Sequence, residues 1–131
     1  DPVIAYLSDT FTKPSPFEPS VILDIEKVWE AKIGMLHEHR SQFYEWLPYN
    51  GGYEDDVPAD DGMRRIWLSA FLAAQSERLA ERWAAWMREH YGYPLDRHPR
   101  RIEAFEASEY GTPLEDEALA RLFPFVPRFL G

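Results

Sequence analysis

Residues 17–43, FEPSVILDIEKVWEAKIGMLHEHRSQF, constrain the fold more than any other stretch of this chain. The adjacent apolar residues Val21-Ile22-Leu23 predict a short strand that is buried on both faces. Asp24 follows this strand directly and is placed to cap a helix that begins beside it. From Ile25 onward the apolar residues recur with the helical period. The stretch therefore predicts a strand, a turn and then a helix from Glu26 to about Trp46.

Two polar residues interrupt the predicted buried face of this helix. Lys32 and His39 are seven positions apart, so they lie close to one azimuth of a helix, inside the apolar stripe. We expect both side chains to be largely buried and hydrogen-bonded, because an unpaired buried charge is costly. A purely structural role is the alternative, with His39 bonded to a backbone carbonyl and Lys32 extending past the sheet. The stripe itself consists of Ile25, Val28, Trp29, Leu36, Phe43 and Leu47.

The residues of this stretch resemble a known family. The pattern Asp24-Ile25, Lys32, Leu36, His39, Ser41, Gln42 is similar to the C-terminal signature of the PIG-L/LmbE family of metal-dependent N-deacetylases. Residues 17–20, FEPS, also fit that family, and residues 102–105, IEAF, resemble its late Ala-Glu-Ala-Phe segment. The family's early Ala-His-Pro-Asp-Asp-Glu motif and its further ligand His do not occur in this sequence. The resemblance therefore covers only the C-terminal part of such an enzyme.

The resemblance implies an α/β fold, the C-terminal portion of a Rossmann-like three-layer α/β/α sandwich with two main helices and two short buried strands. It also implies a Zn²⁺-dependent hydrolase that removes an N-acetyl group from a GlcNAc-type sugar conjugate. Its metal ligands and its general base would lie upstream of Asp1, in the N-terminal half of the same protein. We therefore expect this chain alone to bind no catalytic metal and to be inactive.

The same resemblance suggests which residues lie near a substrate. Gln42 would face the sugar, with Lys32, His39 and Ser41 as supporting side chains, and none of these four would be catalytic or a metal ligand. Ser41 lies on the polar side of the ideal helix, so a bond to a neighbouring loop or to its own backbone is an alternative. His37 and His39 point about 200° apart on a helix and cannot chelate one metal together.

The resemblance assigns residues 1–131 to one segment of a deacetylase domain. We expect a strand-loop-strand-helix unit over 1–47, a long helix over 62–91 and an irregular tail with short elements over 92–131. Pro2–Leu7 predicts a strand, and Pro48 with the following glycines is expected to end the first helix. Arg101–Tyr110 is ambiguous between helix and strand, and the resemblance favours an edge strand. Leu114–Phe123 predicts a short helix. The apolar residues after it, Phe123, Phe125, Val126, Phe129 and Leu130, are expected to dock onto the core.

The helix predicted over residues 62–91 has more apolar surface than one core face can use. Its first half is apolar nearly all round, which predicts a second packing partner, either the N-terminal half or another subunit. Just before it, the acidic run Tyr53–Asp61 offers oxygens for a Ca²⁺ ion, but Asp60 or Asp61 is equally well placed to cap the helix. We expect a homo-oligomer.

Composition narrows the classes of partner. A net charge of −9 argues against nucleic acid or an anionic membrane as the main partner, and no apolar run is long enough to cross a bilayer. The chain has no Cys, which fits a reducing compartment, and we expect a cytoplasmic location. Aromatic residues make up 15% of the chain, which suits a sugar-binding cleft or a subunit interface.

The sequence leaves two alternatives to the deacetylase open. One is a non-catalytic binding or assembly module, and the other is a small α/β domain of unrelated function.

Overall fold

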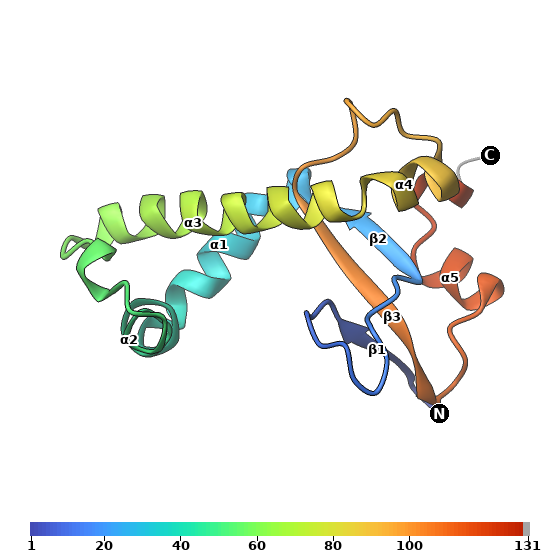
Figure 1. Cartoon of the computed structure of the whole chain (residues 1–131), viewed down its shortest axis with the longest axis horizontal. Helices are drawn as coiled ribbons and strands as arrows, with labels where there is room; N and C mark the ends of the chain where they lie inside the picture. The colour runs from blue at the N-terminus through green and yellow to red at the C-terminus, as the bar shows by residue number, and fades with distance from the viewer. Residues whose placement is uncertain (130–131) are drawn as a thin grey trace.

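The computed structural model describes residues 1–129 of the chain, which form five α-helices and a three-stranded antiparallel sheet. The predicted mixed α/β class is thus confirmed. The strands are β1 (Val3–Leu7), β2 (Val21–Asp24) and β3 (Ile102–Gly111), in the spatial order β1-β3-β2. Figure 1 shows the sheet at one end of the molecule, and helices α1 and α2 with the first part of α3 extending away from it.

Strand β3 is the centre of the sheet. The prediction of a strand over Arg101–Tyr110 is confirmed, but its expected place at an edge is wrong. Ala104 lies opposite Ile22 of β2, and Ala107 lies opposite Ala5 of β1. A ten-residue strand is long enough to pair with two shorter ones, and each of those lies at an edge of the described sheet. The segment after residue 92 therefore contains a ten-residue central strand as well as the short helix over Asp116–Leu122.

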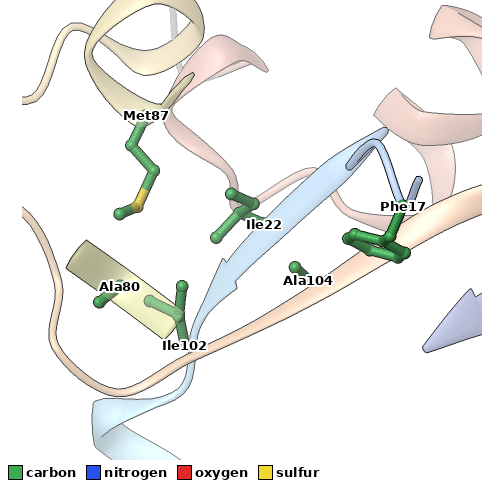
Figure 2. Packing of buried hydrophobic residues seen from close by; sticks show 6 residues of the cluster. All are labelled: Phe17, Ile22, Ala80, Met87, Ile102 and Ala104. Atoms are coloured by element: carbon green, nitrogen blue, oxygen red, sulfur yellow. The ribbon is translucent and has the colours of Figure 1, made fainter. Parts of the chain in front are cut away.

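Helices cover both faces of the sheet. On one face Ile22, Ile102 and Ala104 pack against Ala80 of α3 (Asp61–Arg82) and Met87 of α4 (Ala84–Tyr91), with Phe17 at the margin (Figure 2). On the other face Val21 packs against Leu119 of α5 (Asp116–Leu122) and Val126. The alternation of side chains along each strand produces this division. The adjacent apolar residues of β2 are therefore buried on both sides, as predicted.

Strand β1 is less buried than predicted. Tyr6 is 40% exposed and Leu7 is 68% exposed. The reason is its position, because β1 pairs only with β3 and lies away from the helix pair that covers β2. Of the two short strands that were expected to be buried, only β2 meets that expectation.

The first helix is shorter than predicted. Asp24 Oδ1 accepts a hydrogen bond from the backbone N–H of Glu26, at the start of a 3₁₀ turn over Glu26–Val28. The N-cap of this turn is Ile25 and that of α1 is Val28, so Asp24 is not the cap residue that the sequence predicts. Helix α1 (Trp29–Glu38) follows and ends at His39, whose φ of −82° and ψ of 58° are not helical. The break lets the chain turn, so residues after it no longer share the face of the residues before it.

A second helical segment follows the break. A π-helical turn spans Gln42–Trp46, and α2 (Leu47–Gly51) continues from it to Gly52, which adopts a left-handed φ of 71°. Pro48 does not end the helix, contrary to the prediction, but lies buried in the first turn of α2. Proline has no N–H group, so Pro48 needs no acceptor from the π-helical turn that precedes it.

The helix predicted over residues 62–91 is two helices that meet at a bend. Trp83 leaves the helical region with φ −105° and ψ 11°, although its N–H still bonds to Leu79 O. Ala80 before the bend and Met87 after it pack on the same face of the sheet. Both predicted ends are confirmed, because Asp60 caps α3 through Met63 N and Gly92 ends α4.

The C-terminal residues dock onto the sheet as predicted. The expected short helix is α5, and Val126 is only 2% exposed, whereas Phe125 is 57% exposed. A final 3₁₀ turn covers Pro127–Phe129, and Leu130 lies outside the described residues. None of the helices within residues 1–129 combines the length and the apolar character needed to cross a membrane.

Candidate functional site

Lys32 forms an ion pair with Glu103 of β3. Its Nζ donates a hydrogen bond to Glu103 Oε1 at 2.7 Å, and the two side chains are 29% and 33% exposed. Lys32 is the fourth residue of α1, and Glu103 lies opposite Leu23 in the pairing of β2 with β3. The predicted hydrogen bond of Lys32 is therefore present, but the side chain is half-buried rather than largely buried.

This ion pair lies in a hollow between the sheet, α1 and α3, which we call the Lys32 hollow. Its volume is ≈ 400 Å³. It combines an aromatic ring, an ammonium group, a carboxylate and an amide, which are groups that can contact a polar ligand with some apolar surface. The lining residues are Leu7, Ser8, Trp29, Lys32, Leu72, Gln75, Ser76, Leu79, Ile102, Glu103 and Ala104.

Trp29 is held in place at the wall of the hollow. Its Nε1 donates a hydrogen bond to Ser69 Oγ at 3.1 Å, which links α1 to α3. The Arg101 guanidinium lies 5.1 Å from the centre of the Trp29 ring, and Lys32 Nζ lies 5.8 Å from it. Cations at these distances are attracted to an indole face. The ring and the two cations thus form one ordered group at the start of β3.

Ser76 connects α3 to the start of β3 and so positions Glu103. Its Oγ donates to Arg100 O at 2.9 Å and accepts from Ile102 N at 3.0 Å. Ser76 is only 8% exposed, so these two bonds satisfy backbone groups with little access to water. Next to it, Arg101 donates to Glu77 Oε1 at 3.1 Å.

The other three predicted site residues lie elsewhere. His39, Ser41 and Gln42 are all exposed: α1 ends at His39, and Ser41 and Gln42 follow it. The expected burial of His39 is therefore wrong, because the helical phase does not continue to it. Ser41 lines a separate hollow beside Tyr44, which shares no lining residue with the Lys32 hollow.

The buried histidine is His37, which sequence reasoning did not select. Its side chain lies between α1, the π-helical turn and the start of α3, and the residue is 6% exposed. Nδ1 shares a hydrogen bond with the Tyr44 hydroxyl at 2.6 Å, and Nε2 lies 3.4 Å from Asp61 Oδ2. Trp29, Ile33 and His37 are spaced four residues apart and form the buried face of α1. This spacing is the sequence signal that could have identified His37.

Arg40 completes this cluster by pairing with Asp61, and its hydrogen bond holds the pKa of Asp61 below the ordinary value of 3.8. A depressed carboxyl pKa stabilises the fold above the unfolded-state pKa, and this contribution is lost as pH falls through the folded-state value.

We expect Arg40→Gln to raise the pKa of Asp61, as measured by NMR titration of the carboxyl carbon. The control is Arg88→Gln, at an exposed position of α4, and an Asp61 pKa that is the same in both variants would contradict the assignment.

Within residues 1–129, no three His, Asp or Glu side chains are grouped so that they could hold a metal ion. Comparisons with family models, with curated proteins and with solved structures found no match to this chain.

Proposed function

We propose that this chain is the C-terminal part of a PIG-L/LmbE-like N-deacetylase and that the Lys32 hollow forms part of its sugar-binding wall. One observation carries the proposal. Lys32 belongs to the first segment that resembles the family, and Glu103 belongs to the late segment, 71 positions further on. The two residues form an ion pair. Glu103 lies in β3, and β3 pairs with β2, the strand that precedes the helix of Lys32. Two segments chosen by resemblance alone thus meet at one place.

The groups in the hollow suit a sugar conjugate. Sugar hydroxyls and an acetamido group need both donors and acceptors, which Lys32, Glu103 and Gln75 supply. Trp29 is only 8% exposed, so it supports the wall of the hollow rather than presenting its ring face. Because Glu103 fixes the Lys32 ammonium, the donor is held in position before a ligand arrives. In this proposal the hollow binds and orients the conjugate.

The proposal extends to the larger fold and to the metal. The described sheet, with helices on both faces, would be one portion of a Rossmann-like three-layer sandwich that is completed by upstream residues. A Zn²⁺ ion held by those upstream residues would polarise the amide carbonyl and activate water. His39, Ser41 and Gln42 would contact the conjugate only if the upstream part covers their exposed surface.

The experiment uses the complete polypeptide that contains this chain, assayed for release of acetate from a GlcNAc conjugate. We expect Lys32→Met to lower kcat/KM about ten- to hundredfold, since losing a hydrogen bond to a desolvated polar group costs about 1–3 kcal/mol. The control is Lys13→Met, which changes an exposed lysine of the loop before β2. Wild-type protein without deacetylase activity would refute the function, and an unchanged Lys32→Met variant would refute the role of the hollow.

Gln42→Ala in the same assay tests the other predicted contact. We expect a loss of similar size, because a Gln amide supplies both a donor and an acceptor to a sugar. Asn50→Ala, at an exposed amide of α2, is the matched control. Gln75 does not serve as a control because it lines the Lys32 hollow. If the Gln42 and Asn50 variants have equal kcat/KM, Gln42 has no role in substrate binding.

A non-catalytic assembly module is the second candidate function. The exposed apolar residues Met63 and Ile66 on α3 favour it, because such surface suits a subunit contact. The deacetylase assay separates the two candidates. Activity that depends on Lys32 supports the enzyme, whereas a complete protein that assembles without activity supports the module.

A further inference from the structure

An apolar stripe runs along the exposed side of α3. It consists of Met63, Ile66, Ala70 and Ala74, all of which are exposed, with Met63 at 52% and Ile66 at 63%. The steps of three, four and four residues keep these side chains on one line of the helix. Leu68, two positions before Ala70, lies on the opposite side of α3 and is buried.

We propose that two copies of this chain pair through the stripe, with their α3 helices antiparallel and a two-fold axis passing beside Ala70. Ile66 and Ala74 are each four positions from Ala70, so each Ile66 lies opposite Ala74 of the second copy. A large side chain then faces a small one on both sides of the axis, which is the condition for close packing. A two-fold contact of this kind uses the same surface on both copies.

The charges beside the stripe select the antiparallel direction. Asp60 and Arg78 are eighteen positions apart, which equals five turns of 3.6 residues, so they lie on the same line beside the stripe. Both side chains are exposed. Antiparallel pairing brings Arg78 of each copy close to Asp60 of the other, whereas parallel pairing would bring like charges together. Antiparallel helices also place opposite dipole ends side by side.

Single-cysteine variants test this pairing directly, because the chain has no Cys of its own. Under mild oxidation, Ala70→Cys is expected to form a disulfide-linked dimer of twice the 15.4 kDa chain mass. Ile66→Cys alone is not expected to do so, since the two copies of residue 66 lie about 12 Å apart along the axis. That separation exceeds the ~7 Å limit between the Cα atoms of a disulfide. A mixture of Ile66→Cys and Ala74→Cys should form the mixed dimer.

The control is Ala85→Cys, at an exposed position of α4 away from the stripe. Light scattering provides the second measurement, in which Ile66→Asp should lose the dimer of the wild type while its circular dichroism spectrum stays unchanged. A monomeric wild type that does not cross-link through Ala70→Cys overturns the proposal. Strong linkage of Ile66→Cys to itself, or linkage of Ala70→Cys to a different protein, also overturns it. These readouts do not depend on deacetylase activity.

Discussion

Replacing Met87 by Ala is expected to lower the free energy of unfolding by about 2–5 kcal/mol, the range for removing a large buried side chain and leaving a cavity. Met87 is 0% exposed and packs against the sheet in the cluster that contains Ile22 and Ile102 (Figure 2). It is also the buried residue of the short helix α4. Chemical denaturation monitored by circular dichroism measures the loss.

Met35→Ala is the matched control for this substitution. It removes the same side chain from α1, at a position that is 65% exposed. Surface substitutions of this kind usually change the free energy of unfolding by no more than about 0.5 kcal/mol. Similar losses in both variants would mean that α4 does not pack on the sheet as described.

Replacing Tyr91 by Phe is expected to cost about 1–3 kcal/mol, because it leaves a buried donor and a buried acceptor without a partner. The Tyr91 hydroxyl accepts from Ile22 N and donates to Ile22 O, both at 3.0 Å. Ile22 is 2% exposed and lies in the edge strand β2, where these two backbone groups face away from β3. Burial raises the pKa of Tyr91, so the hydroxyl keeps the proton that it donates.

Tyr93→Phe is the control, since it removes a hydroxyl from the same part of the chain. Burial raises the pKa of Tyr93 as well, but no bond from its hydroxyl to β2 is present among the described residues. Amide hydrogen exchange at Ile22 gives a local readout that should accelerate only in the Tyr91 variant. If the two variants lose equal stability and Ile22 exchanges equally, the hydroxyl bridge is not what stabilises β2.

Local signals in the sequence were sufficient to predict several helices and strands. The apolar run of β2 and the helical period after it predict the strand and the helix that follows it, and the structure has both. Asp60 and Gly92 mark the start of α3 and the end of α4 in the same way. These signals depend on only a few neighbouring residues, so they can be recognised in the sequence without knowledge of the fold.

The break at His39 was not predictable from local signals. Neither His39 nor the residues beside it are helix breakers, so the apolar period was extended through them to Leu47. The extension placed His39 on the buried face, where the structure has His37. Contacts of His37 with Tyr44 and with Asp61 accompany the turn of the chain, and they join segments that the sequence alone does not bring together.

The sequence by itself determined the α/β class, the strand and helix around Asp24 and the choice of Lys32 as a polar residue that needs a partner. The tertiary structure decided that the partner is Glu103, that β3 is the central strand and that His39, Ser41 and Gln42 lie apart from Lys32. The physical reason is the range of the interactions. Caps and periodicity are local, whereas strand order and the Lys32 ion pair depend on packing between residues 71 positions apart.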